Sequence, residues 1–388
     1  MNPTHNRMRN SLNFSGGPGA LPEVVLQQVQ AAIAAVPEVG LSVLGISHRS
    51  EWFARVVAEA EANILHLLGL DSGYRVLFLQ GGATQQFSMV PMAWLAGRTK
   101  AADYLHTGYW SGKALPAARR EGPVRVAWSG EMAGFARLPA ADELELSPEA
   151  PYLHYVSNET VEGLQFHRVP GRDDVPRICD MSSDFLSRPG EFHRFAMIYA
   201  HAQKNLGPAG VTIVVLRRDM LERARGDLPG FLDYRVQAEA NSIYNTPPVF
   251  AIYVVLLVSR WLRHDIGGLA AMGRINAAKA ARLYAAIDGS DGFFRPWAAR
   301  ADRSCMNVAF NLATPALEAR FLHEAAAAGF SGLEGHRSIG GLRASLYNGL
   351  TLEAVERLVA FMEAFRRASR GAGERASFHR QGVLASKN

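Results

Sequence analysis

The sequence predicts an α/β protein with two domains: a large domain with a mostly parallel, seven-stranded sheet covered by helices, and a smaller α+β C-terminal domain. Short apolar runs alternate with helical patterns between residues 76 and 216. Strands that are apolar throughout are buried on both faces, as in parallel sheets. After the paired prolines at 247–248, helical patterns dominate. The 388 residues also exceed what one simple core usually holds.

Two amphipathic helices are predicted before the sheet, over residues 22–36 and 50–68. In the second, apolar residues recur on one stripe and Gly69 follows the last of them, which is typical of a helix end. The predicted strands follow at residues 76–79, 102–105, 124–128, 152–156, 175–179, 195–199 and 211–216. Helices are predicted between the first three strands, over residues 84–95 and 111–120.

Beyond the two prolines we expect a different arrangement, with helices and a single strand. The predicted elements are a long helix over residues 250–287, a strand at 306–310, and helices at 314–328 and 352–367. We divide the chain accordingly into an N-terminal extension (1–13), a large cofactor-binding domain (14–262), a small C-terminal domain (263–370) and a flexible tail (371–388).

The composition argues against several classes of protein. The formal net charge of +5 comes without a compact basic block carrying interleaved aromatic residues, so no nucleic acid partner is expected. The two cysteines, Cys179 and Cys305, form neither a disulfide framework nor a metal-ligand spacing, so we expect no metal and a reducing compartment. The first residues lack the apolar core of a secretory signal, and the longest apolar stretch, 249–258, is too short to span a membrane. We therefore expect a cytoplasmic protein without a membrane partner.

Lys204 is the most informative residue of the chain. It lies in a turn rich in glycine and proline between two predicted buried strands, in a sequence with few lysines. A desolvated lysine, unlike arginine, can lose its proton and form a Schiff base. The alternative is a solvated surface lysine, the usual fate of this residue type, but a turn between core strands disfavours it.

Asp180 supplies the second half of the argument, because it directly follows a short predicted strand. A carboxylate at a strand end and a lysine on a later turn are the pair that holds pyridoxal phosphate. The acid contacts the ring nitrogen and the amine contacts the aldehyde. The pair Asp180 and Lys204 therefore predicts an enzyme that uses this cofactor.

Residues 80–86, Gln-Gly-Gly-Ala-Thr-Gln-Gln, follow the first predicted strand and open a helix. Backbone N–H groups at a helix start bind anions, and glycines let a phosphate approach closely. Glycine pairs at strand ends are common, so an ordinary turn is the competing interpretation. Together with Lys204 and Asp180, Ala83 and Thr84 mark the natural place for the cofactor's phosphate.

Two more polar or aromatic groups follow predicted strands. Trp110 lies between glycines after the second strand, where its face could stack on a pyridine ring. Thr160 follows the fourth strand, at the sheet edge where ligands gather, and could donate to a phenolate oxygen. A tryptophan that caps the core and a structural turn are the alternatives that the sequence leaves open.

Basic residues recur in small groups near glycines. These groups are His48 with Arg49, His336 with Arg337, and Arg343 alone. Arginine binds carboxylate and phosphate through two parallel hydrogen bonds, so a substrate with an α-carboxylate and a distal phosphate needs several such residues in one cleft. Each pair taken alone is more often a solvated surface feature.

Taken together, these segments resemble the phosphoserine aminotransferases, a family of class V, fold-type I enzymes that depend on pyridoxal 5′-phosphate. The similarity runs in order from about residue 14 to about residue 367. The matching segments are residues 14–18, 47–49, 102–104, 108–110, 157–160, 186–189, 202–208, 244–248, 335–337 and 341–345.

The resemblance implies how the cofactor is held. Lys204 would be the Schiff-base lysine and proton carrier, and Asp180 would keep the ring nitrogen protonated. Trp110 would stack on the ring, and Thr160 would bond its oxygen. The phosphate would be bound by Ala83, Thr84 and Gln203, with the partner subunit's Asn245 and Thr246 in a homodimer with shared active sites.

The resemblance also implies the reaction. The enzyme would interconvert phosphoserine plus 2-oxoglutarate with 3-phosphohydroxypyruvate plus glutamate in serine biosynthesis. Arg343 would bind the substrate α-carboxylate. The distal phosphate, or the γ-carboxylate of glutamate, would be bound by His48, Arg49, His336 and Arg337. The sequence leaves open whether 4-phosphohydroxythreonine of pyridoxine biosynthesis is also a substrate.

Some positions depart from the family pattern, and other functions are possible alternatives. Gly16 stands where several relatives have serine, and the Gly-Gly-Ala-Thr turn differs from that of relatives with an arginine near Thr84. Another class V enzyme, such as an alanine–glyoxylate-type aminotransferase, is the nearest alternative. A cysteine desulfurase would need a thiol over the cofactor, which neither cysteine supplies. A ligand-sensing regulator would need a DNA-binding module, for which residues 1–13 are too few.

Overall fold

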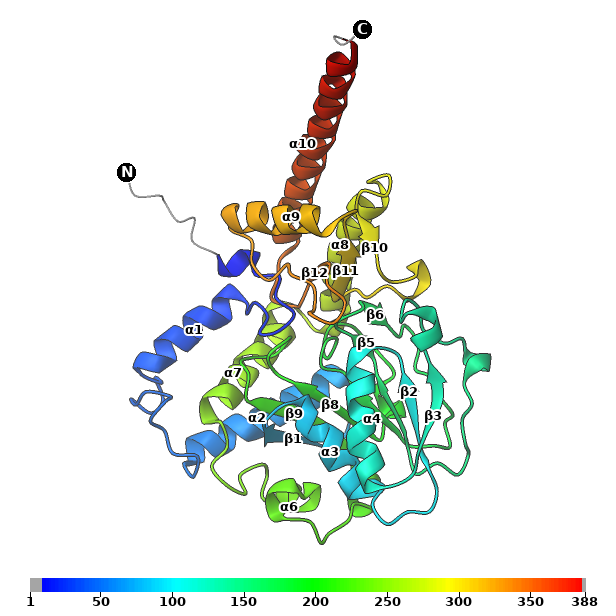
Figure 1. The fold of residues 1–388 in the computed structure, drawn as a ribbon. Helices are drawn as coiled ribbons and strands as arrows, with labels where there is room; N and C mark the ends of the chain where they lie inside the picture. Colours follow the sequence, from blue (N-terminus) through cyan, green and yellow to red (C-terminus); the bar gives the residue numbers. More distant parts are fainter. Residues whose placement is uncertain (1–8, 386–388) are drawn as a thin grey trace.

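The computed structural model describes the backbone of residues 9–385 and the side chains of residues 9–370. A seven-stranded sheet lies at its centre, in the order β1-β9-β8-β7-β4-β2-β3 (Figure 1). Its strands are β1 (Tyr74–Gln80), β2 (Ala102–His106), β3 (Val124–Ser129), β4 (Leu153–Val156), β7 (Arg177–Asp180), β8 (Met197–His201) and β9 (Val211–Arg217). Only β9 runs against both of its neighbours, so the predicted mostly parallel sheet is confirmed.

Helices cover both faces of this sheet, which explains why its strands are apolar at consecutive positions. One face packs against α1 (Glu23–Ala34), α2 (Glu51–Leu68) and α7 (Val249–Arg260). The other packs against α3 (Ala83–Trp94), α4 (Tyr109–Glu121), α5 (Arg218–Glu222) and α6 (Tyr234–Glu239). In β1, for example, Val76 belongs to the first core and Leu77 to the second, as strand alternation requires.

A third core lies at one end of the sheet. It is built from α8 (Leu269–Asp288), α9 (Pro315–Ala327), the start of α10 (Leu352–Ala385) and strand β11 (Asn307–Asn311). β11 pairs with β10 (Arg295–Pro296) and β12 (Leu342–Ser345) in an antiparallel sheet. Leu12 and Phe14 from the start of the chain also pack into this core. In Figure 1 these elements sit above the central sheet, and α10 projects away from the body.

Several element boundaries differ from the prediction. The expected single helix over residues 250–287 is wrong: α7 passes into a π-helical turn at Trp261–Asp265, and α8 starts only after Gly267 and Gly268. Both glycines have positive φ, +82° and +90°, which an α-helix cannot contain. Periodicity alone did not reveal this break.

Other elements were missed. The short hairpin of β5 (Asn158–Glu159) and β6 (Leu164–Gln165) and the strands β10 and β12 are too short for the hydrophobic pattern to mark. Helix α10 continues to Ala385, beyond the predicted end at Arg367. Residues 1–8 of the predicted extension and 386–388 of the predicted tail lie outside the described residues. None of the helices that the structure describes is both long and apolar enough to cross a membrane.

Candidate active site

A cavity of about 460 Å³ opens at the carboxyl ends of the parallel strands β4, β7 and β8, beside the turn after β1. Ligands in open α/β sheets gather at this edge. The structure brings most of the sequence-predicted residues into its wall. These are Ala83, Thr84, Trp110, Thr160, Asp180, Gln203, Lys204, His336 and Arg343.

Lys204 lies on the turn between β8 and β9, and its side chain is buried. Its Nζ donates to Thr160 Oγ1 at 2.5 Å and to Ser183 Oγ at 2.9 Å. Burial lowers the pKa of Lys204 to about 8, while the Asp180 carboxylate opposes this shift. The amine therefore loses its proton at a lower pH than an ordinary lysine does, which favours a role as nucleophile or base.

Asp180 is the last residue of β7 and is also buried. Its Oδ1 accepts the backbone N–H of Ser182 at 2.8 Å. Burial raises the pKa of Asp180, and the Ser182 hydrogen bonds and the charge of Lys204 counteract it. A cation placed in the cavity against this carboxyl group would favour its ionised form.

The turn after β1 forms an anion cradle. Gly81 has φ of +97°, and its N–H donates to Gly210 O at 3.1 Å, which ties the turn to the start of β9. Gly82 then precedes α3, and the first two residues of this helix, Ala83 and Thr84, line the cavity, so the helix N-terminus lies at its wall. The helix dipole adds to the attraction for a phosphate there.

Trp110 lies in the first turn of α4, and its ring centre is 6.0 Å from Lys204 Nζ. Its indole Nε1 is buried and has no hydrogen-bond partner among the described residues. The ring thus forms one wall of the cavity next to the reactive amine, where a flat ligand would stack. Trp110 also packs against the second core, so it contacts both the core and the cavity.

Two buried glutamates that the sequence analysis did not single out hold this end of α4. Glu159 accepts the N–H groups of Trp110 and Ser111, both at 3.0 Å, and Glu162 accepts that of Tyr109 at 2.8 Å. Burial raises the pKa of Glu159, and burial and the Glu159 carboxylate raise the pKa of Glu162 to about 8. Glu159 and Glu162 lie close to Thr160 in the sequence, shortly after a predicted strand. Acidic residues at the carboxyl end of a strand could therefore have marked them as site residues.

Arg343 on β12 reaches the cavity from the third core. A Cβ atom added to Gly16 would lie 2.4 Å from Arg343 Nη2, so the glycine leaves room for the guanidinium. Arg343 Nε is buried without a partner among the described residues, and burial lowers the pKa of Arg343. A partly buried guanidinium that lines an open cavity and has an unpartnered Nε suits a carboxylate ligand. His336 lines the same cavity, whereas Arg337 is exposed outside it.

Besides Arg337, four predicted residues do not line this cavity in the single chain: His48, Arg49, Asn245 and Thr246. His48 and Thr246 line a second hollow of about 560 Å³, and Ala209 belongs to the walls of both. Arg49 and Thr246 are exposed.

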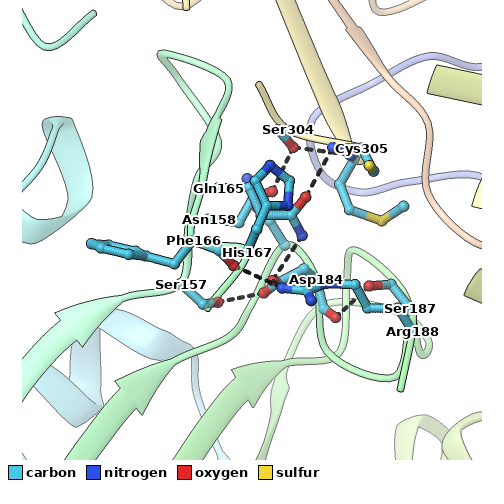
Figure 2. A network of polar contacts seen from close by, with 12 residues as sticks. Ser157, Asn158, Gln165, Phe166, His167, Asp184, Ser187, Arg188, Ser304 and Cys305 are labelled. Atoms are coloured by element: carbon cyan, nitrogen blue, oxygen red, sulfur yellow. Dashed lines mark hydrogen bonds and ion pairs between the residues drawn. The ribbon is translucent and has the colours of Figure 1, made fainter. Parts of the chain in front are cut away.

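A polar network around Asp184 holds the loop that follows β7 (Figure 2). Asp184 accepts hydrogen bonds from Ser157 Oγ and from Gln165 Nε2. Gln165 Oε1 in turn accepts the backbone N–H of Cys305 at 2.9 Å. The network joins the β5–β6 hairpin to the third core. Neither cysteine lines the cavity, and burial raises the pKa of both thiols.

Comparison with known proteins agrees with this geometry. Residues 11–358 match the family described as aminotransferase class-V. A phosphoserine aminotransferase of Laribacter hongkongensis is 50% identical over 355 residues, 92% of this chain and 98% of that protein. A solved phosphoserine aminotransferase from Bacillus circulans subsp. alkalophilus has a TM-score of 0.89 at 46% identity, covering 92% of this chain and 98% of its own. A PLP-bound phosphoserine aminotransferase from Trichomonas vaginalis has a TM-score of 0.84 at 38% identity, covering 91% of this chain and 99% of its own.

Proposed function

Because the chain belongs to the class V aminotransferases, we propose that it is a phosphoserine aminotransferase. It interconverts phosphoserine plus 2-oxoglutarate with 3-phosphohydroxypyruvate plus glutamate. The observation that carries this proposal is the Lys204 amine, buried and without a direct carboxylate bond, in a cavity that also exposes Asp180, Trp110 and Arg343.

The residues of the cavity fit pyridoxal 5′-phosphate. Lys204 Nζ suits the aldehyde, Asp180 suits a protonated ring nitrogen, and the first turn of α3 suits the phosphate. The unpartnered indole of Trp110 supplies a flat wall for the ring. When bound, the cofactor supplies an aldehyde that links covalently to amines and a ring that accepts electrons.

The protein supplies binding, orientation and proton transfer. Arg343 fixes the substrate through its α-carboxylate, which places the α-carbon near Lys204. Lys204 Nζ takes the proton from that carbon and returns it, and its lowered pKa of about 8 lets it act in both directions. Thr160 and Ser183 accept hydrogen bonds from the amine and so define its resting position.

Selectivity for an acidic substrate end would come from His336, Arg337, His48 and Arg49. Of these only His336 lines the cavity of the single chain. We infer that the enzyme is a homodimer in which His48 and Arg49, like Asn245 and Thr246, serve the partner's site. Exposed apolar side chains near these residues, Leu41 and Leu44 at 54% and 66% exposure, support a covered surface.

The absorbance spectrum of the purified protein tests the proposal. We expect a yellow protein that phosphoserine and glutamate bleach, whereas serine and alanine do not. Bleaching by alanine with glyoxylate as acceptor would instead favour the alanine–glyoxylate type. Comparing 4-phosphohydroxythreonine with phosphoserine in the same assay decides whether pyridoxine biosynthesis uses this enzyme too. The free thiols of Cys179 and Cys305 fit the reducing cytoplasm in which we place it.

A further inference from the structure

His201, the last residue of β8, has no role in the function proposed above. Strand β8 alternates, and Met197 and Tyr199 face the core formed with α3 and α4. Side chains two residues apart lie on the same face of a strand, so His201, two residues after Tyr199, lies on the same face as Met197 and Tyr199. The imidazole therefore lies on the face that carries α3, at the sheet edge where the cavity opens.

The neighbours of His201 are the parts of the anion cradle. His201 pairs with Thr212 of β9, and Thr212 Oγ1 donates to Gly81 O at 3.3 Å. His201 lines the cavity together with Gly81, Gly82 and Gly210. Its ring is thus part of the wall that contains the first turn of α3.

The imidazole of His201 has no hydrogen-bond partner among the residues that the structure describes. Its Nδ1 is buried without a hydrogen bond, and no described residue bonds to Nε2. The backbone N–H of His201 donates to Ser182 Oγ at 3.3 Å, so this hydroxyl group bonds the main chain and not the ring. Burial, reinforced by the charge of Lys204, lowers the pKa of His201 well below its usual value. The neutral imidazole carries one N–H group. This group either has no acceptor or donates to a ligand in the cavity.

We propose that His201 is an additional ligand of the cofactor's phosphate, which it binds by donating Nε2–H to a phosphate oxygen. Nδ1 is the buried nitrogen, so Nε2 is the one that can face the cavity. This bond supplements the N–H groups of α3 and the side chain of Gln203. The inference rests on the proposed function, because it concerns the same cofactor.

The test compares pyridoxal 5′-phosphate with pyridoxal, which lacks the phosphate. The full-length holoenzyme is stripped of cofactor, and binding of each compound is titrated by absorbance in wild type, His201→Ala and His201→Gln. We expect His201→Ala to weaken binding of pyridoxal 5′-phosphate roughly tenfold or more and to leave pyridoxal within twofold. The amide of His201→Gln should restore most of the loss. His167→Ala, a histidine outside the cavity, is the matched control.

Equal loss for both compounds, or no loss for pyridoxal 5′-phosphate, would overturn the inference. A second measurement needs no folded variant. In wild type carrying nitrogen-labelled histidine, a ring N–H resonance coupled to the cofactor's phosphorus should appear with pyridoxal 5′-phosphate and be absent with pyridoxal. Absence of that resonance contradicts the inference. Failure of the wild type to bind the cofactor at all would instead contradict the proposed function.

Discussion

Several side chains in the cavity lack the hydrogen-bond or ion-pair partners that such groups usually have inside a protein. Lys204 bonds to hydroxyl groups instead of a carboxylate, and Arg343 Nε and Trp110 Nε1 have no partner among the described residues. Unpaired buried polar groups destabilise a protein unless a ligand satisfies them. Such groups in one cavity are the residue-scale signature of a binding site.

Lys204→Ala should abolish transamination while the protein remains folded. The variant loses both the covalent attachment point and the amine that moves the proton. We expect single-turnover rates at least three orders of magnitude below wild type, measured with phosphoserine, with an unchanged circular dichroism spectrum. Turnover near the wild-type rate would show that another amine carries the reaction.

Arg343→Ala should weaken the use of every amino acid substrate. Removing the guanidinium leaves the bound α-carboxylate unpaired in a buried site, which costs roughly 2–5 kcal/mol. This should appear as a fall in kcat/KM of more than tenfold for both phosphoserine and glutamate. The exposed Arg337 offers a control. Arg337→Ala should weaken binding of the phosphate of phosphoserine and of the γ-carboxylate of glutamate, but not binding of the α-carboxylate. A change in kcat/KM below twofold for Arg343→Ala would contradict the assignment.

Glu162→Gln should change how the stability of the protein depends on pH. Because the pKa of Glu162 is raised to about 8, the folded state binds a proton that the unfolded state releases above its usual pKa of 4.5. Wild-type stability therefore falls as pH rises between these values, by up to about 1.4 kcal/mol per pH unit. Denaturant unfolding from pH 5.5 to 8 measures this. The free energy of unfolding of Glu162→Gln, relative to that of wild type, should increase as the pH rises. Parallel curves would exclude a protonated Glu162.

At the scale of elements, the segment after β12 connects the third core to the active site. Lys279 on α8 is fully buried and donates to Leu346 O, Tyr347 O and Leu350 O, each at 2.9 Å. Asn348 in the same segment donates its N–H to Asn205 Oδ1 at 3.0 Å, next to Lys204. The segment thus fixes Arg343 and Lys204 relative to each other.

Lys279→Met should destabilise the protein strongly. Burial lowers the pKa of Lys279 to about 7, but three carbonyl acceptors satisfy all three donors of the ammonium form. Methionine has no N–H donors, so in Lys279→Met the three carbonyl groups lose their partner, which should lower the free energy of unfolding by roughly 3 kcal/mol. Chemical denaturation measures this, and Lys100→Met, which removes an exposed ion pair with Glu149, should change it by less than about 1 kcal/mol. An equal effect of both variants would refute the structural role.

At the scale of the whole molecule, the single chain presents a nearly complete active site and an incomplete set of distal anion ligands. His48 and Thr246 lie in a separate hollow that meets the cavity only at Ala209. A dimer would let one subunit complete the other's site, and the two sets of residues would then belong to different chains.

Hybrid dimers test this arrangement. Lys204→Ala and Arg49→Ala should each be nearly inactive with phosphoserine, but mixing and refolding them together should restore about a quarter of wild-type activity. Half of the statistical dimers are hybrids, and each hybrid contains one site with neither defect. Mixing two separately prepared Lys204→Ala samples is the control. No recovery, with hybrids confirmed by mass, would mean that each chain completes its own site.

The sequence by itself determined the chemistry and the class of fold. Strands that are apolar at every position can only be buried on both faces, and so the sheet and its helices followed. Lys204, Asp180, Trp110 and Thr160 were predicted as site residues because each follows a predicted strand, and the carboxyl ends of parallel strands meet at one edge of the sheet. Such signals are local, and local patterns survive in a single sequence.

Only the tertiary structure decided which polar groups lack partners. Glu159 and Glu162 bond to the first turn of α4, and Lys279 bonds to three carbonyl groups, in each case across a long stretch of sequence. The lack of a partner for the His201 ring likewise depends on which distant segments surround it. No periodicity encodes such contacts, because they depend on how elements pack and not on the sequence within any one of them. The break at Gly267 and Gly268 was hidden for a related reason: the helical pattern resumes beyond it, and only the backbone φ angles separate the two helices.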